Sequence, residues 1–443
     1  MGAVSEAYEA ARGAQPAWAA RPLTERLQIM AIFRTLVEER SDELARLLTT
    51  ETAKPISQAR NELAGVLPRV DYFVEQTERV LATDIVLDDS AGGLREQISY
   101  EPLGVVANIS AWNYPWFVGS NVFLPALLAG NAVLYKPSEY ATDVGLSIAS
   151  TLHDAGVPAD VFAPVVGDGT VGVELLTQPI DGVFFTGSHP TGQLIAQALA
   201  GRMIPVQLEL GGKDPVYVVD DVDVPAAAES LADGAFYNNG QSCCSVERIY
   251  VHDHVYDEFV DTFTKTVESF VVGDPFDEAT YIGPLTRPQQ IELLESQVQD
   301  AVAKGATLRR GGKPAVGDAA TFEPTVLVDV NSSMSVMRDE SFGPIIGIQR
   351  VGGDDEAIAL MNDTDYGLTA GVFGSDESRA RTILEQVDAG SAYWNCCDRV
   401  SPRLPWSGRG HSGVGSTLST AGILAFVRPK AWHLKPPRQG SQL

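Results

Sequence analysis

Cys243 lies in a segment whose residue types suit a reactive thiol. The apolar residues before it have the helical spacing of one buried stripe: Leu231, Ala232, Ala235 and Phe236. Asn239-Gly240 then predicts the end of that helix, because glycine permits a left-handed turn. We therefore expect Cys243 just past a helix end, where a thiol can face a cleft and act as a nucleophile. A buried structural cysteine is the alternative, since free cysteine is among the most buried residue types.

A second segment, Val206-Gln-Leu-Glu209-Leu-Gly-Gly-Lys213, places one carboxylate at the end of a strand-like run. Leu208 and Leu210 flank Glu209, so the alternation of a strand points the carboxylate away from their face. An apolar setting disfavours the charged form of a glutamate and raises its pKa, which suits a general base. A glutamate that faces water on an edge strand is the alternative, and the glycines leave either open.

Together the two segments resemble the paired signatures of the NAD(P)-dependent aldehyde dehydrogenase superfamily. Leu208-Glu-Leu-Gly-Gly-Lys213 and Gly240-Gln-Ser-Cys243 come in the order of that family and near its usual separation. The resemblance implies that Cys243 is the nucleophile and that Glu209 activates the water that hydrolyses a thioester. It also implies that the side chain of Asn113 stabilises the oxyanion.

Buried strands followed by loops precede these segments. The continuous apolar runs at 104–110, 132–136 and 182–186 predict parallel strands of an open α/β sheet, which binds ligands at its carboxyl edge. A turn and helix start follow the third run at Gly187-Ser188, an arrangement that suits pyrophosphate. The resemblance implies that Lys136 and Glu139 hold the adenosine ribose, which favours NAD and leaves NADP open.

Further cofactor contacts come from the same resemblance. The segment Asp339-Glu-Ser-Phe-Gly-Pro344 is similar to a family motif whose glutamate holds the nicotinamide ribose and whose phenylalanine packs near the nicotinamide. The complete expected set of cofactor-binding residues is Ser110, Trp112, Lys136, Glu139, Gly187, Ser188, Leu210, Glu340 and Phe342.

Aromatic residues near these motifs suggest a tunnel for the aldehyde. We expect its wall to contain Tyr114, Trp116, Trp394 and Asp398. Arg399 and Arg403 could equally meet a carboxylate on the substrate, so the sequence leaves the identity of the aldehyde open.

The length of 443 residues predicts more than one domain, and the pattern predicts an α/β fold. Helices are expected from Ser5 to Val80 and from Ser120 to Ala129, because their apolar residues recur at helical spacing. We predict a Rossmann-like NAD-binding domain at 1–83 and 102–211 and an α/β catalytic domain at 212–410. A small β oligomerisation segment at 84–101 and 428–443 completes the fold that the resemblance implies.

Strand-like runs between Asp84 and Tyr100 flank Asp88-Asp-Ser-Ala-Gly-Gly93, which has the composition of a hairpin turn. In the family such a hairpin reaches a neighbouring subunit and pairs with the C-terminal tail, here Trp432-His-Leu-Lys435. The resemblance therefore implies a homodimer or homotetramer. A surface hairpin with a disordered end is the alternative.

A net charge of −26 argues against nucleic acid or an anionic membrane as a partner. No apolar run approaches the ~20 residues that span a bilayer, and no targeting segment is visible. The cysteines form two adjacent pairs, Cys243-Cys244 and Cys396-Cys397, which match structural zinc spacing poorly. We therefore expect no metal site and reduced thiols in the cytoplasm.

The leading hypothesis is an NAD-dependent enzyme that oxidises an aldehyde to its carboxylic acid, with the size of the aldehyde left open. A CoA-acylating aldehyde dehydrogenase is one alternative, although such relatives commonly lack the glutamate that Glu209 represents. A catalytically idle NAD-binding scaffold is the other, because a fold does not fix a function.

Overall fold

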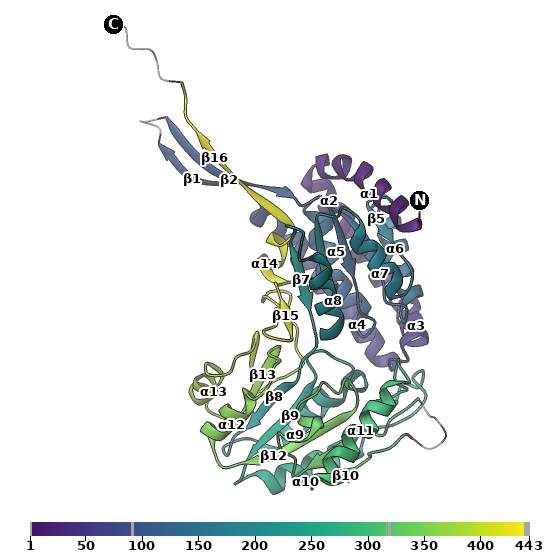
Figure 1. Ribbon diagram of the computed structural model, residues 1–443, viewed down its shortest axis with the longest axis vertical. Coiled ribbons are helices and arrows are strands. Elements are labelled where there is room, and N and C mark those ends of the chain that lie inside the picture. The colour runs from purple at the N-terminus through teal and green to yellow at the C-terminus, as the bar shows by residue number, and fades with distance from the viewer. Residues whose placement is uncertain (1, 90–92, 316, 318–319, 438–443) are drawn as a thin grey trace.

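Helices open the chain, as the apolar spacing predicts. The computed structural model describes residues 2–89, 93–315, 317 and 320–437. The opening helices are α1 (Ala3–Ala20), α2 (Leu23–Glu39), α3 (Ser41–Thr52) and α4 (Ile56–Leu81). Their apolar stripes pack with α5 (Pro115–Leu128) and α6 (Thr142–Asp154) into one hydrophobic cluster. This cluster forms much of the upper lobe in Figure 1.

The sheet of the upper lobe has the strand order β15-β7-β6-β3-β4-β5. Its strands are β3 (Val105–Ile109), β4 (Ala132–Lys136), β5 (Phe162–Pro164), β6 (Gly182–Thr186), β7 (Val206–Glu209) and β15 (Gly413–Val414). All neighbouring pairs are parallel except β15 with β7. Val106 packs toward the cluster of α2, α4, α5 and α6, whereas Val105 and Ala107 pack toward α1, α7 (Gly169–Thr177) and α8 (His189–Leu199). Helices on both faces explain why these strands are apolar throughout.

The lower lobe is built on a second sheet, in the order β10-β11-β12-β9-β8-β13-β14. Its strands are β8 (Asp214–Val218), β9 (Val246–His252), β10 (Thr307–Arg310), β11 (Thr325–Val328), β12 (Ile345–Val351), β13 (Thr369–Phe373) and β14 (Ser391–Trp394). Its helical elements are α9 (Val224–Phe236), η1 (Tyr237–Gly240), α10 (Tyr256–Glu268), α11 (Gln290–Ala303), η2 (Ser335–Met337), α12 (Asp354–Met361) and α13 (Glu377–Leu384). Val216 and Val218 pack toward α9 and α10, and Tyr217 packs toward α11 and α12. The predicted α/β fold class is therefore confirmed.

An arm projects from the upper lobe (Figure 1) and consists of β1 (Asp84–Asp89), β2 (Leu94–Pro102) and β16 (Val427–Leu434). β2 pairs antiparallel with both neighbours, so the predicted hairpin and its pairing with the tail are present within one chain. The predicted turn and the last residues of the tail fall partly outside the described residues. The chain returns to the arm as β16 after α14 (Ser419–Leu424). Apolar side chains of the arm, such as Val86 on β1 and Trp432 on β16, are exposed.

The helix predicted from Ser120 to Ala129 begins five residues earlier, at Pro115. Proline is well suited to the first turn of a helix, because its fixed φ fits and its missing N–H has no partner there in any case. Among the described residues, no helix combines the length and the apolar character needed to cross a membrane. The domain boundaries at residues 211 and 410 stay a prediction.

Candidate active site

The segment that carries Cys243 leaves its helix through consecutive left-handed residues. α9 ends at Phe236, and φ is then +53° at Asn238, +58° at Asn239 and +69° at Gly240. A side chain at Gly240 would collide with the backbone carbonyl of Gly343, so glycine is required by space as well as by conformation. The predicted helix end is confirmed, and the thiol follows it in an irregular segment.

Hydrogen bonds fix this segment against the upper lobe. The backbone N–H of Asn238 donates to Oε1 of Gln58 at 2.8 Å, and its side-chain amide donates to the carbonyl of Asn113 at 3.2 Å. The side-chain amide of Asn113 in turn donates to the carbonyl of Gln241 at 3.1 Å. Asn113 is buried, and the residue that its amide contacts, Gln241, lies two residues before Cys243 in the chain.

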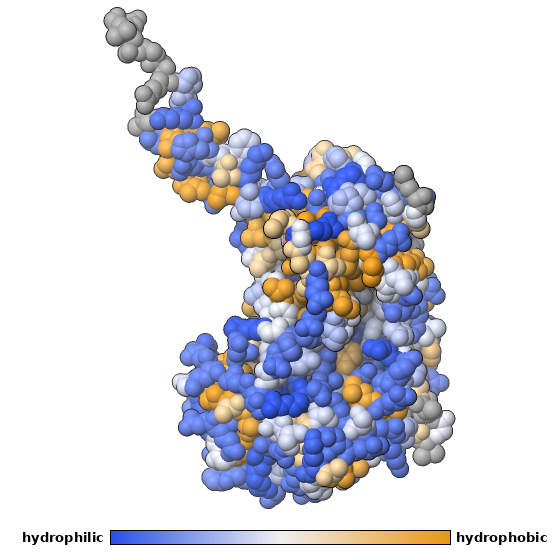
Figure 2. All heavy atoms as spheres, in the orientation of Figure 1, coloured by the Kyte–Doolittle hydropathy of each residue, from blue (hydrophilic) through white to orange (hydrophobic). Residues whose placement is uncertain are grey.

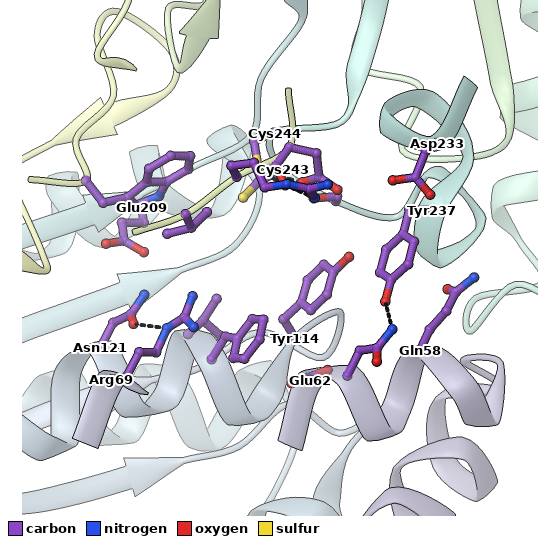
Figure 3. Close-up of a pocket in the computed structure, with 18 residues that line it drawn as sticks. Gln58, Glu62, Arg69, Tyr114, Asn121, Glu209, Asp233, Tyr237, Cys243 and Cys244 are labelled. Atoms are coloured by element: carbon purple, nitrogen blue, oxygen red, sulfur yellow. Dashed lines mark hydrogen bonds between the residues drawn. The ribbon is translucent and has the colours of Figure 1, made fainter. Parts of the chain in front are cut away.

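Cys243 and Glu209 line one cavity of about 510 Å³ between the lobes (Figure 3). Cys243 is half-buried, so its thiol is open to this space. Tyr114 and Asp398, two of the residues expected in the wall of the tunnel, line the same cavity. The structure thus brings together a thiol, a carboxylate and two of the predicted tunnel residues from distant parts of the chain.

Glu209 is only 6% exposed, which excludes the alternative of a glutamate facing water. Its carboxylate accepts hydrogen bonds from the hydroxyls of Thr417 and, at 3.4 Å, Thr186. Burial raises the pKa of Glu209 to about 7, although these hydrogen bonds oppose the rise. A carboxyl group that titrates near neutrality can take a proton from water at physiological pH.

Cys244 differs from its neighbour in burial and in contacts. It is 3% exposed, and its Sγ donates to Oδ1 of Asp398 at 3.0 Å. A hydrogen bond with Cys243 and burial raise the pKa of the Cys244 thiol well above its usual value. Asp398 also accepts from Oγ of Ser242 at 3.1 Å, so this carboxylate holds both neighbours of the accessible thiol. The alternative of a buried structural cysteine therefore describes Cys244 rather than Cys243.

Two residues predicted for the tunnel lie elsewhere. Trp116 is completely buried and stacks on Phe33 at 6.5 Å, because the early start of α5 turns this position toward the helical core. Trp394 lies on the edge strand β14, and its indole N–H donates to the carbonyl of Gly374 at 3.0 Å. It lines a separate surface hollow with Glu377 and Arg381. The prediction of these two tryptophans as tunnel residues is therefore wrong.

Charged residues on α4 and just before it lie in or next to the cavity, and sequence reasoning missed them. Lys54 and Glu62 form a fully buried ion pair, and Lys54 Nζ donates to the carbonyl of Asn113 at 2.7 Å. Glu62 and Arg69 line the cavity although they fall on the otherwise apolar, buried stripe of α4. Polar residues at apolar positions of an amphipathic helix were the signal that could have revealed them.

A larger groove of about 1,000 Å³ runs along the carboxyl ends of β3, β4 and β6. Six of the predicted cofactor residues line it: Ser110, Trp112, Lys136, Glu139, Gly187 and Ser188. Leu210 does not line it, because its buried side chain packs against α8 at Gly192. Phe342 reaches the groove indirectly through an edge-on contact of 5.5 Å with Trp112.

The groove has the chemistry that a dinucleotide requires. Ser188 precedes the first turn of α8 without capping it, so the backbone N–H groups of His189 and Thr191 are available to an anion, whereas Pro190 has none. In the described part of the chain Lys136 has no ion-pair partner, and Glu139 is exposed beside it. Figure 2 shows hydrophobic side chains gathered on the upper lobe, where Val173 and Leu194 are exposed along the groove. Apolar contacts and anion donors together suit an adenine nucleotide.

Glu340 lies where the lobes meet, next to the segment of Glu209. Its Oε1 accepts from the backbone N–H of Gly212 at 3.2 Å, and burial, with the nearby Glu247, raises the pKa of Glu340 to about 8. Glu247 accepts from the backbone N–H of Phe342 at 3.0 Å and pairs with Lys213 at 2.6 Å. This buried network fixes the loop that carries Glu340 and Phe342.

Comparison with known proteins agrees with this geometry. The model of the aldehyde dehydrogenase family matches residues 2–432. The chain is 37% identical to a succinate-semialdehyde dehydrogenase [NADP(+)] of Deinococcus radiodurans, over 95% of this chain and 88% of that protein. It is 36% identical to a betaine aldehyde dehydrogenase of Rhizobium leguminosarum, over 97% of this chain and 89% of that protein.

Solved structures give the same result. The crystal structure of an E. coli NADP-dependent enzyme superposes with a TM-score of 0.95 at 34% identity, over 98% of this chain and 90% of that one. The structure of PnpE in complex with nicotinamide adenine dinucleotide superposes with a TM-score of 0.94 at 32% identity, over 98% and 89%. The motifs, the fold and nearly the full length agree, and the chain belongs to the aldehyde dehydrogenase family.

Proposed function

We propose that the protein oxidises an aldehyde to the carboxylic acid with NAD, and that Cys243 and Glu209 carry the two halves of the reaction. One observation carries the proposal: an accessible thiol and a buried glutamate with a pKa near neutrality share one cavity, and six predicted cofactor residues line a second groove. The first half needs a nucleophile, and the second half needs a base for water.

In the first half, the thiolate of Cys243 attacks the aldehyde carbon and forms a thiohemiacetal. The backbone N–H of Cys243 and the side-chain amide of Asn113 are the proposed donors to the oxyanion, since the Asn113 amide already lies against this segment. A bound nicotinamide would supply the acceptor for the hydride that leaves the same carbon. The product of this half is a thioester on Cys243.

In the second half, Glu209 takes a proton from water, which attacks the thioester carbon. The bond between that carbon and Sγ of Cys243 breaks, the acid leaves, and the thiolate is restored. Burial suits Glu209 to this role, because it keeps the base strong enough to deprotonate water near neutral pH. The same residue argues against the CoA-acylating alternative, in which another acceptor replaces water.

For the cofactor, Lys136 and Glu139 would hold the adenosine ribose, and Ser188 and its helix would hold the pyrophosphate. Glu340 would hold the nicotinamide ribose. The exposed carboxylate of Glu139 would repel a 2′-phosphate, so we propose a preference for NAD with some use of NADP. Because a similar protein is named for NADP, kcat/KM with NAD and with NADP is the measurement that tests this preference.

We also propose a homodimer or homotetramer joined through the arm, because exposed strand edges and apolar side chains favour pairing with another chain. All four cysteines are free thiols, which supports a reducing compartment such as the cytoplasm.

The experiment is a panel of aldehydes with NAD and NADP, followed by the absorbance of the reduced nicotinamide. Turnover of at least one aldehyde, abolished in Cys243→Ala, is expected. NAD binding without reduced cofactor from any aldehyde would instead indicate the idle scaffold, and turnover that depends on CoA would indicate the acylating enzyme.

A further inference from the structure

Arg69 is a buried cation that forms no ion pair in the described part of the chain. It lies on α4, is 4% exposed, and lines the cavity of Cys243. Its Nε donates to Oδ1 of Asn121 at 3.2 Å, and its Nη1 donates to the carbonyl of Gly65 at 2.8 Å. Within the residues that the structure describes, no carboxylate lies within ion-pair distance of it. A buried charge with only neutral partners is strongly unfavourable, so its retention in a cavity wall needs a reason.

Arg69 and Asn121 form a pair of free donors. Nη2 of Arg69 and Nδ2 of Asn121 have no hydrogen-bond partner in the described part of the chain. Figure 3 shows the two side chains next to each other on one wall of the cavity, with Glu209 and Cys243 on the opposite wall. Two adjacent N–H donors, one of them charged, match the two oxygens of a carboxylate.

Most other charged side chains of the cavity are already engaged; Arg399, which has no ion pair in the described part of the chain, is exposed rather than buried. Glu62 pairs with Lys54, Asp398 accepts from Ser242 and Cys244, and Asp233 accepts from the hydroxyl of Tyr281 at 2.6 Å. Arg69 is therefore the buried cation of this cavity wall that no carboxylate pairs among the described residues.

The aromatic rings of the cavity also favour an anionic group on the substrate over a cationic one. Lys54 lies over the ring of Tyr114 at 3.8 Å, and Arg69 lies over the ring of Phe117 at 3.8 Å. An ammonium group on a substrate would compete with these cations for the ring faces. An anionic group would instead be attracted by them.

We propose that Arg69, with Asn121, binds the distal carboxylate of a short aldehyde acid whose aldehyde group lies at Cys243. This proposal names the substrate class of the function proposed above and rests on it. Arg69 then determines specificity, and its charge takes no part in the chemical steps.

The test compares 4-oxobutanoate with butanal, which share chain length and differ in the carboxylate. The unmodified enzyme should prefer 4-oxobutanoate in kcat/KM, and Arg69→Met should lower the ratio of the two kcat/KM values on the order of 10²-fold, mainly through KM. Arg69→Lys should keep part of the preference because the charge remains. Arg79→Met, which removes an exposed cation from the same helix, is the matched control and should leave the ratio unchanged.

A purely structural role for Arg69 predicts equal losses for both aldehydes. If Arg69→Met does not fold, competition in the unmodified enzyme decides, with butanoate expected to inhibit at least ~10-fold more tightly than butanamide. Equal use of the two aldehydes together with equal inhibition by the two analogues would overturn the proposal. Oxidation of no aldehyde at all would instead contradict the proposed function, so the two failures are distinct.

Discussion

Burial raises the pKa of Glu209 from 4.5 to about 7, and this shift makes the hydrolytic half of the reaction depend on pH. With a pKa near 7, the ionised fraction of Glu209 rises ~30-fold between about pH 5.5 and about pH 8.5. With the ordinary value, the same fraction would change by only ~10% over that range. Glu209→Gln keeps the size of the side chain and removes the base, so the pH dependence should disappear with it.

The assay measures the rate at which the thioester on Cys243 is hydrolysed after one pulse of aldehyde and NAD. Its rate should rise with pH around a midpoint near 7 in the unmodified enzyme. In Glu209→Gln the rate should be ~10²–10⁴-fold lower at high pH and nearly independent of pH. A pH-independent rate in the unmodified enzyme, or an unchanged rate in the variant, would refute the assignment of Glu209 as the base.

Stability gives a second reading of the same shift. Because the folded-state pKa lies above the ordinary value, the ionised carboxylate is disfavoured in the fold, and stability should fall as pH rises from about 4.5 to about 7. Relative to the unmodified protein, Glu209→Gln should gain on the order of 3 kcal/mol over this window. Denaturant unfolding at both ends of the window measures this gain, and a difference that does not change with pH would contradict the shift.

Other predictions concern the thiols, the cofactor and assembly. Iodoacetamide should label Cys243 before the buried, hydrogen-bonded Cys244, as measured by peptide mass, and full activity in Cys243→Ala would reverse that assignment. Glu139→Gln should narrow the difference in kcat/KM between NAD and NADP by removing charge repulsion, whereas a higher kcat/KM with NADP in the unmodified enzyme would refute the role of Glu139. Deleting residues from Ala431 onward shortens β16 and should lower the mass in light scattering, and a native monomer would end the assembly proposal.

Local sequence was sufficient for the residues whose roles depend on their own segment. Asn239-Gly240 predicts the end of α9, and the alternation of apolar residues around Glu209 predicts β7. The settings of Cys243 and Glu209 could therefore be predicted without tertiary contacts. The buried strands of the cofactor lobe were equally readable, because helices on both faces leave continuous apolar runs.

Residues that depend on packing between distant elements could not be predicted in this way. Trp116 was placed in the tunnel because the start of α5 at Pro115 was missed, and a shift of a few residues along a helix changes the face on which a side chain lies. Arg69 and Asn121 are in contact only because α4 packs on α5, and the local sequence of neither helix predicts that contact. Polar residues in the buried stripe of α4 were the available signal.

The central claim is that Cys243 carries the acyl group and that Glu209 releases it. The most direct measurement mixes Glu209→Gln with NAD and an aldehyde that the unmodified enzyme oxidises. The reaction is stopped with acid, and the modified residue is determined by peptide mass. The account predicts a burst of NADH near one per active site and the acyl group on Cys243. An acyl group on Cys244, or steady turnover at the unmodified rate without any acylated cysteine, would contradict it.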